Sequence, residues 1–147
     1  MTYDEYLTRA LELPGARADK PFENDFETTV LRHGEGGKWF GILMHVAPGR
    51  IGRTGDDYTA AKYLAPKTVA PGRIGRTGDE RIWIVNLKCT PEEGFALREE
   101  FPAICPAYHM NKLHWITLPL DADLPEAIIS GITERSFDLT AKKVRHR

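Results

Sequence analysis

Apolar residues at the start of the chain recur at the spacing of a helix, at positions 3, 6, 7, 10 and 11. Thr2 and Glu5 stand three residues apart at the head of this run, which is the arrangement of a capping box. Leu13-Pro14-Gly15 follows, and a proline next to a glycine ends a helix. The pattern predicts an amphipathic helix over the first part of the chain.

Two further helices are predicted later in the chain. Thr90 precedes Pro91, a residue favoured at the first position of a helix, and Glu93 completes a second capping box. This helix should run to about Phe101. The last helix is predicted over residues 125–135, where isoleucines at positions 128, 129 and 132 share one face.

Four strands are predicted between these helices, over residues 26–33, 38–46, 81–87 and 113–118. A glycine-rich turn joins the first two strands into a hairpin. In the second strand, Phe40, Ile42 and Met44 alternate with other residues, so we expect these three side chains to share one face of the sheet.

The order helix, three strands, helix, strand, helix predicts an α+β fold. Strands joined by hairpins form a mainly antiparallel sheet, with the helices packed on one side of it. We therefore expect a two-layer domain with four to five strands that spans residues 1–147.

An eleven-residue segment, VAPGRIGRTGD, occurs twice, at 46–56 and at 69–79, with a period of 23 residues. Removing one period leaves a single short hairpin between the second and third strands. We infer that a 23-residue unit was inserted at the tip of this hairpin, where the entropy of loop closure rises slowly with length. A sequencing artefact is the simpler alternative. The fold should tolerate the insertion.

Charge is unevenly distributed along the chain. The 20 Lys/Arg and 21 Asp/Glu residues give a formal net charge of −1, which argues against strong general affinity for nucleic acid. Residues 47–88, however, contain eight basic and four acidic residues. Any anion-binding face should therefore include the middle of the chain.

The two cysteines, Cys89 and Cys105, fit reduced thiols better than a disulfide scaffold. Cys105 is close in sequence to His109 and His114, which would suit a metal. No CxxC pair accompanies them, and prolines at 102 and 106 prevent the helix that carries zinc-finger histidines. We predict no metal and no cofactor.

No residue shows a recognisable catalytic context, so we predict that the protein is not an enzyme. No apolar run approaches the roughly 20 residues that a membrane helix needs, and the first residues do not form a secretory signal. We expect a cytoplasmic protein without a membrane partner.

Residues 106–115 read PAYHMNKLHW, a mixture of histidines, lysine, asparagine and aromatics that an ordinary helix or strand does not need. GKWFGIL at 37–43, NLKCTPEE at 86–93 and SFDLT at 136–140 accompany it. Together these segments resemble the MmcQ/YjbR family, small bacterial proteins described as predicted DNA-binding proteins with a double-wing motif. The resemblance implies an α+β fold related in shape to frataxin-like and secretion-chaperone-like proteins.

The resemblance also implies a function, in which basic hairpin wings contact the phosphate backbone of double-stranded DNA. The wing candidates are the arginines of the duplicated segment: Arg50, Arg53, Arg73 and Arg76. A guanidinium pairs with a phosphate as a bidentate donor. A solvated loop kept soluble by its charges is the alternative explanation of these residues.

A second set of candidate nucleic-acid contacts lies around the irregular segment and the second strand: Lys38, Lys88, His109, Asn111 and Lys112. These side chains offer contacts to a phosphate from several directions. A structural role competes with this function, because polar atoms in a proline-rich turn need hydrogen bonds. A ligand-binding or enzymatic pocket around Lys88, His109 and His114 is a further alternative.

Trp39 and Trp115 are predicted to lie on the open side of the sheet, because Ile116 and Leu118 take the other face of the last strand. Tryptophans there would stack on unpaired bases or form a protein-binding patch, unless loops cover them. The alternative function is therefore a protein-interaction or chaperone-like module that acts through the open sheet face. The sequence is compatible with a monomer and with a weak homodimer.

Overall fold

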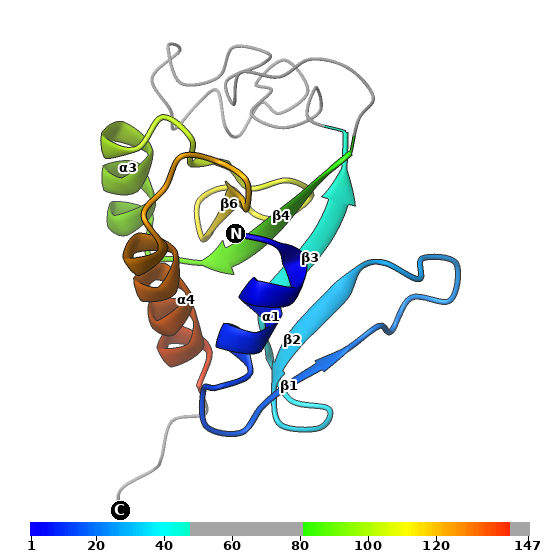
Figure 1. Cartoon of the computed structure of the whole chain (residues 1–147). Coiled ribbons are helices and arrows are strands. Elements are labelled where there is room, and N and C mark those ends of the chain that lie inside the picture. The colour runs from blue at the N-terminus through cyan, green and yellow to red at the C-terminus, as the bar shows by residue number, and fades with distance from the viewer. Residues whose placement is uncertain (48–80, 142–147) are drawn as a thin grey trace, which may run out of the picture.

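The computed structural model describes residues 1–47 and 81–141 of the chain (Figure 1). The wing candidates and most of the duplicated segment lie outside these residues. The helices and strands in chain order are α1 (Tyr3–Ala10), β1 (Ala16–Asp19), β2 (Thr29–His33), β3 (Trp39–Val46), β4 (Ile82–Lys88), α3 (Pro91–Glu100), β5 (Cys105–Pro106), β6 (Trp115–Pro119) and α4 (Glu126–Thr140).

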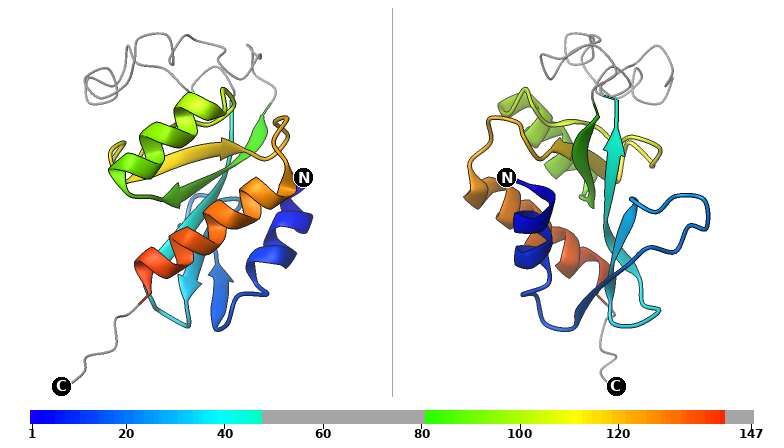
Figure 2. Two further views of the ribbon diagram at one scale, coloured as in Figure 1. Left: turned by 90° about the vertical axis from the view of Figure 1, so that its left-hand side faces the viewer. Right: turned by 45° about the vertical axis from the view of Figure 1, so that its right-hand side comes forward.

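The strands of the described residues form one six-stranded sheet in the order β1-β2-β3-β4-β6-β5, and all neighbouring strands are antiparallel. Helices α1, α3 and α4 lie on one side of this sheet (Figure 2). The predicted two-layer α+β architecture is confirmed, but the sheet has six strands instead of four to five. Among the described residues, none of the helices combines the length and the apolar character that a membrane span needs.

The two additional strands are short and lie at the edges of the sheet. The inward-facing residues of β1 are Ala16 and Ala18, which lack the β-branched and aromatic side chains that signal a strand. β5 consists of two residues, one of them a proline. Neither sequence is long or apolar enough to show the alternation of a strand, so the prediction missed both.

The predicted capping boxes are formed to different extents. Thr2 Oγ1 accepts from the backbone N of Glu5 at 3.1 Å, and the Glu5 carboxylate accepts from the backbone N of Thr2 at 3.0 Å. Thr90 also caps α3 by accepting from the backbone N of Glu93 at 3.1 Å. The carboxylate of Glu93, however, pairs with Arg135 of α4, so the second box is only half formed.

Helix α4 runs to Thr140 instead of ending near Arg135 as predicted. The Phe137 ring lies 5.0 Å from the ring of Phe40 and 4.1 Å from that of His33. The hydroxyl of Thr140 is hydrogen-bonded to His33 Nε2 at 2.8 Å. These contacts with the sheet support the last turns of the helix, and they involve residues more than ninety positions away.

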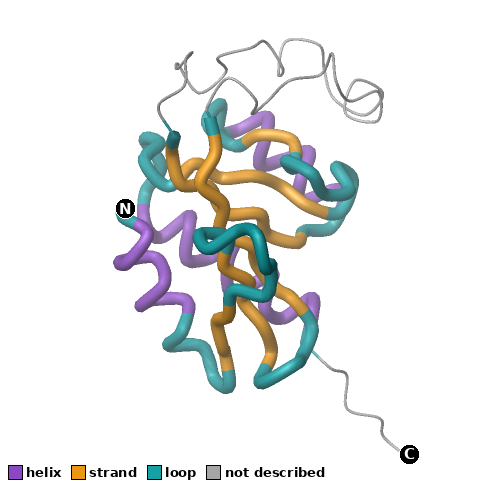
Figure 3. The backbone as a smooth tube through the Cα atoms, turned by 90° about the vertical axis from the view of Figure 1, so that its right-hand side faces the viewer, coloured by secondary structure: helices purple, strands orange, loops and turns teal. Residues whose placement is uncertain are grey.

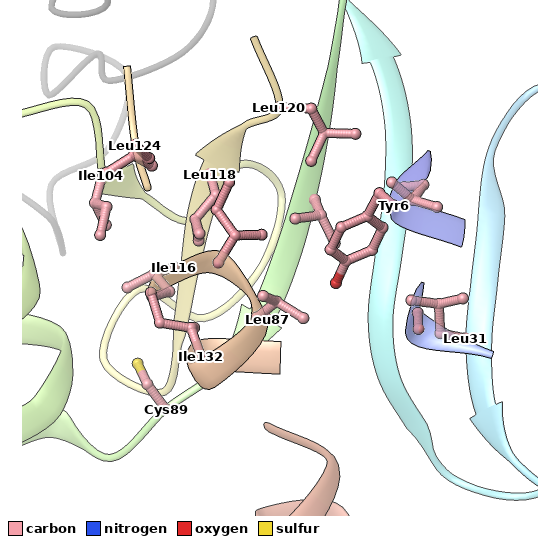
Figure 4. Packing of buried hydrophobic residues seen from close by; sticks show 14 of the residues in the cluster. Tyr6, Leu31, Leu87, Cys89, Ile104, Ile116, Leu118, Leu120, Leu124 and Ile132 are labelled. Carbon is pink, nitrogen blue, oxygen red and sulfur yellow. The ribbon is translucent and has the colours of Figure 1, made fainter. Parts of the chain in front are cut away.

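The main core lies between the helices and the sheet (Figure 4). Tyr6 of α1, Leu87 of β4, Ile116 of β6 and Ile132 of α4 are all almost completely buried there. The burial of such residues determines which side chains of each strand face the helices. Their neighbours in sequence must face the open side of the sheet.

A bulge in β3 changes the predicted facing of its residues. The pairing of β3 with β2 shifts between Leu31 and Arg32, which leaves Phe40 as an extra residue. Phe40 turns toward the helices and is fully buried, whereas Met44 packs in a second cluster on the opposite face. The prediction that Phe40, Ile42 and Met44 share one face is therefore wrong.

Candidate nucleic-acid interface

Side chains that are far apart in the sequence form a row across the open face of the sheet. Because neighbouring strands are antiparallel, the starts of β1, β3 and β6 and the ends of β2 and β4 lie at the same end of the sheet (Figure 1). The open-face residues at these positions are named the transverse row: Arg17, Arg32, Trp39, Lys88 and Trp115.

The register of the sheet determines the order of the transverse row. Arg17 pairs with Arg32, Arg32 pairs with Trp39, and Lys88 pairs with Trp115. Trp39 and Lys88 are not directly paired, because the pairing of β3 with β4 ends at Gly41 and Leu87. Strands are spaced about 4.8 Å apart, so five adjacent strands place the ends of the row roughly 19 Å apart.

The helix-facing neighbours of these residues show that the row points away from the helices. Four residues that directly precede or follow a row residue contact the main core: Ala16, Leu31, Leu87 and Ile116. Figure 3 views the sheet from the other side, where no helix covers the strands and the loop between β1 and β2 projects forward.

Trp39 is held between a cation and an aromatic edge. The Arg32 guanidinium carbon lies 5.4 Å from the centre of its ring, and Phe22 meets it edge-on at 6.1 Å. Arg32 also donates from Nε to Asp19 Oδ1 at 2.7 Å. The positive charge of Arg32 is therefore partly neutralised.

Trp115 and Lys88 form the second pair of a cation and an aromatic ring in the row. Lys88 Nζ lies 6.0 Å from the centre of the Trp115 ring, within the range of a cation–π interaction. Among residues 1–47 and 81–141, no carboxylate forms an ion pair with Lys88 or with Arg17. Both charges remain available to an anion.

The backbone at Lys88 is fixed by α4. The Ser136 hydroxyl accepts from the backbone N of Lys88 at 2.9 Å and donates to the carbonyl oxygen of Phe40 at 2.5 Å. This side chain bridges β3 and β4 one residue beyond their last direct pair, which is Gly41 with Leu87. The next backbone N, that of Cys89, donates to the carbonyl oxygen of His114 at 2.9 Å, which aligns β4 with the start of β6.

The candidates of the irregular segment have mixed roles. Asn111 Oδ1 accepts from the backbone N of Leu113 at 2.9 Å and of His114 at 3.0 Å, which is the structural role considered for it. His109 is exposed and has a φ of 60°. Lys112 is partly buried, and this burial lowers its pKa. Within the described residues, no hydrogen bond, ion pair or ring contact joins His109 or Asn111 to the transverse row.

Asn86 is an important residue that the sequence analysis did not identify. It is fully buried on the open-face side, and its Nδ2 donates to the carbonyl oxygen of Tyr108 at 2.8 Å. The Thr117 hydroxyl donates to Asn86 Oδ1 and accepts from the backbone N of Tyr108 at 2.8 Å. This network fixes the irregular segment to the sheet. The available signal was an asparagine within an apolar strand, because such a buried amide needs partners.

The two thiols and four clefts of the described residues do not bring together the residues of the predicted pocket. Cys89 and Cys105 are both buried and unpaired with each other, and burial raises the pKa of Cys89 to about 11, so that it is a poor nucleophile at neutral pH. Four clefts of 350–470 Å³ lie elsewhere on the protein, and none of these four is lined by Lys88, His109 or His114. In the part of the chain that the structure describes, no three His, Cys, Asp or Glu side chains are grouped to hold a metal ion.

The loop between β1 and β2, residues 20–28, is acidic. It contains Glu23, Asp25 and Glu27, and Asp25 has a lowered pKa because the Thr28 side chain and backbone donate hydrogen bonds to it. Its Phe26 is 80% exposed, more than the other exposed large apolar residues. Carboxylates repel phosphates, so this loop is unsuited to follow a nucleic-acid backbone.

The sequence is similar to known bacterial proteins over most of its length. A model of the YjbR family matches residues 11–139. The uncharacterised protein YyaQ of Bacillus subtilis is 32% identical over 140 residues, which cover 95% of this chain and 98% of that protein. The uncharacterised protein YjbR of Escherichia coli K12 is 38% identical over 53 residues, or 36% of this chain and 45% of that protein.

Solved structures are similar over the whole fold. A crystal structure of a Pseudomonas syringae protein matches with a TM-score of 0.74 and 31% identity, covering 96% of this chain and 100% of that one. A Deinococcus radiodurans protein matches with a TM-score of 0.64 and 27% identity, covering 97% of this chain and 80% of that one. Together with the match to the family model over most of the chain, these similarities show that the chain belongs to the YjbR family.

Proposed function

We propose that this protein binds DNA and that the open face of its sheet contacts the phosphate backbone. The observation that carries the proposal is the convergence of Arg17, Arg32 and Lys88 into the transverse row. Lys38, which is exposed, directly precedes Trp39 and adds a positive charge at the same end of the sheet. These residues are up to 71 positions apart in sequence, and strand pairing brings them together.

The charges of the row suit phosphates better than the net charge of the chain suggests. No carboxylate of the described residues pairs with Arg17 or Lys88, so both side chains are available to bind an anion. Arginine offers bidentate hydrogen bonds and lysine a mobile point charge. The formal net charge of −1 is a sum over the whole chain, in which the acidic residues elsewhere offset the cations of this end of the sheet.

The wing arginines would form a second group of phosphate contacts. In the sequence they lie between Val46, the last residue of β3, and Ile82, the first residue of β4. They would add up to four guanidinium groups to the cations of the transverse row.

Fluorescence anisotropy with a duplex oligonucleotide across a salt series tests the proposal. Each phosphate contact contributes about −0.9 to the slope of log K against log salt. Changing Arg17, Lys38 and Lys88 together to Gln should weaken binding and reduce the magnitude of the slope by about 2.7. Arg9→Gln, on the helix side, is the matched control. It should leave both the binding affinity and the salt slope nearly unchanged. Absence of binding at low salt, or an unaltered slope in the triple variant, would refute the proposal.

The competing function is a protein-interaction or chaperone-like module that acts through the open face. The exposure of Phe26 and of Phe22, which contacts Trp39, favours it. It predicts a concentration-dependent dimer or complex in sedimentation experiments. Trp115→Ala should disrupt this species, while substitution of the wing arginines should have no effect on it.

A further inference from the structure

The transverse row contains a feature that phosphate contacts alone do not require. From β1 to β6, the row consists of two cations, a tryptophan, a third cation and a second tryptophan. Each tryptophan lies next to a cation that contacts its ring, Arg32 for Trp39 and Lys88 for Trp115. Both tryptophans are partly exposed. Alternation of aromatic and cationic side chains is typical of surfaces that bind unpaired bases together with their phosphates.

We infer that the transverse row binds single-stranded nucleic acid, with a base stacked on Trp115, the phosphate next to that base on Lys88, and a phosphate further along the strand on Arg17. This inference rests on the proposed function and specifies its ligand. In a duplex, the bases are already paired and stacked, so a tryptophan on a sheet surface does not reach their faces. In a single strand, each base presents a free face, and stacking adds to the phosphate contacts.

Trp115 is the better stacking platform of the two tryptophans. Within the described residues, its recorded ring contact is with Lys88, whose long flexible side chain moves easily from the ring to a phosphate. The ring of Trp39 already has Arg32 on it and Phe22 at its edge. Trp39 and Phe22 would therefore flank the bound nucleic acid, and Trp115 would be the ring on which a base stacks.

The backbone around Trp115 is rigid enough to keep such a platform in place. Lys88 and Trp115 are directly paired residues of β4 and β6, and Ser136 of α4 anchors the backbone N of Lys88. Thr117, two residues beyond Trp115, belongs to the buried network with Asn86. A stacking surface held on paired strands binds with little loss of conformational entropy.

The test compares three fluorescein-labelled probes of equal length: oligo(dT) of 12 nucleotides, oligo(rU) of 12 nucleotides and a 12-base-pair DNA duplex. Anisotropy is measured at one low salt concentration for the wild type, Trp115→Leu, Trp115→Phe and Lys88→Gln. Phe26→Leu, an exposed aromatic residue outside the row, is the matched control. Circular dichroism confirms that each variant is folded.

The wild type should bind at least one single-stranded probe more tightly than the duplex. Trp115→Leu should lower the single-strand affinity by about 5- to 150-fold, the range for loss of one stacked base, and should change duplex affinity less than twofold. Trp115→Phe should restore much of the affinity, because phenylalanine also stacks. Lys88→Gln should weaken binding of all probes, since a phosphate contact does not depend on base pairing. The two single-stranded probes distinguish DNA from RNA as the preferred strand.

The outcomes separate this inference from the proposed function. Duplex binding as tight as single-strand binding, with no effect of Trp115→Leu, would overturn the inference and leave DNA binding intact. No binding of any probe would overturn both. A third outcome is that sedimentation shows a dimer that Trp115→Leu dissociates, while oligonucleotide binding does not depend on Trp115. This outcome would assign the face to a second copy of the chain and would also overturn the inference.

Discussion

At the scale of single residues, the open face of this sheet depends on two buried polar side chains. Asn86 and Thr117 have no exposed surface, although they lie on strands that are otherwise apolar. They bind each other and both polar backbone atoms of Tyr108. The irregular segment before β6 is thereby attached to the sheet through hydrogen bonds, in addition to the apolar packing of Tyr108.

Thr117→Val tests the importance of this network. Valine keeps the shape of threonine, but it leaves the backbone N of Tyr108 and Oδ1 of Asn86 without the hydroxyl. A buried polar group that loses its partner costs about 1–3 kcal/mol, so urea denaturation should show a loss of stability of that size. The control is Thr8→Val at an exposed position of α1, where a change within about 0.5 kcal/mol is expected. Equal effects at the two positions would contradict a stabilising role of the network.

At the scale of elements, α4 supports the end of the sheet that carries the transverse row. The direct pairing of β3 with β4 ends at Gly41 and Leu87, and just beyond this pair Ser136 reaches from the helix to bind one backbone atom of each strand. Thr140 and Phe137 extend the same contact to His33 of β2. The SFDLT motif is therefore part of the architecture that orients β2, β3 and β4.

Ser136→Ala should destabilise the protein by about 1–3 kcal/mol, because it removes the acceptor for the buried backbone N of Lys88. Urea denaturation gives the loss of stability, and hydrogen exchange of the Lys88 amide gives its location. Ser130→Ala on the same helix is the control, since Ser130 makes no recorded side-chain hydrogen bond among the described residues. Unchanged exchange at Lys88 in the Ser136 variant would show that the bridge is unimportant.

At the scale of the whole molecule, the fold places two kinds of surface next to each other. The transverse row places cations at one end of the open face, while the loop between β1 and β2, whose Phe22 contacts Trp39, carries three carboxylates and the exposed Phe26. The duplicated segment joins the opposite ends of β3 and β4, where pairing continues to Val46 and Ile82. The described pairing of β3 with β4, which carries the core, is therefore complete between residues 41–46 and 82–87.

Deletion of residues 57–79 should preserve the fold. The connection between β3 and β4 then shortens from 35 residues to 12, and loop-closure entropy predicts a gain of about 1 kcal/mol in stability. Thermal denaturation and circular dichroism measure this. The variant also lacks Arg73 and Arg76, so the salt slope for duplex DNA should decrease in magnitude by about 1.8 if both contact phosphates. A marked loss of stability would show that the deleted segment contributes to the folded state.

Much of the fold was predictable from local patterns in the sequence. Thr2 and Thr90 begin their helices as predicted, and Ile116 and Leu118 face the core as the alternation in their strand indicates. These features depend on neighbours within a few residues, so the sequence contains their full physical cause. The motifs around residues 86–93 and 106–115 also sufficed to indicate the family.

Other features depended on tertiary contacts. A single extra residue, Phe40, changes the facing of half a strand, and whether a strand bulges depends on its partner strand. The edge strand β1 exists because β2 offers free backbone groups, although its own residues show little strand signal. The helix α4 continues past Arg135 because the sheet supplies contacts for Phe137 and Thr140.

By itself, the sequence determined the fold class, the N-terminal caps of α1 and α3, the family and the types of residue available for an interface. Only the tertiary structure decided which of them meet: Lys88 with Trp115, and Arg32 with Trp39, while Asn111 became part of a turn. The physical reason is that a surface is assembled across strands, and the register between strands is set by burial and hydrogen bonding of the whole sheet. Spacing along one strand indicates which face of the sheet a residue takes. It does not indicate which residue of the adjacent strand lies beside it.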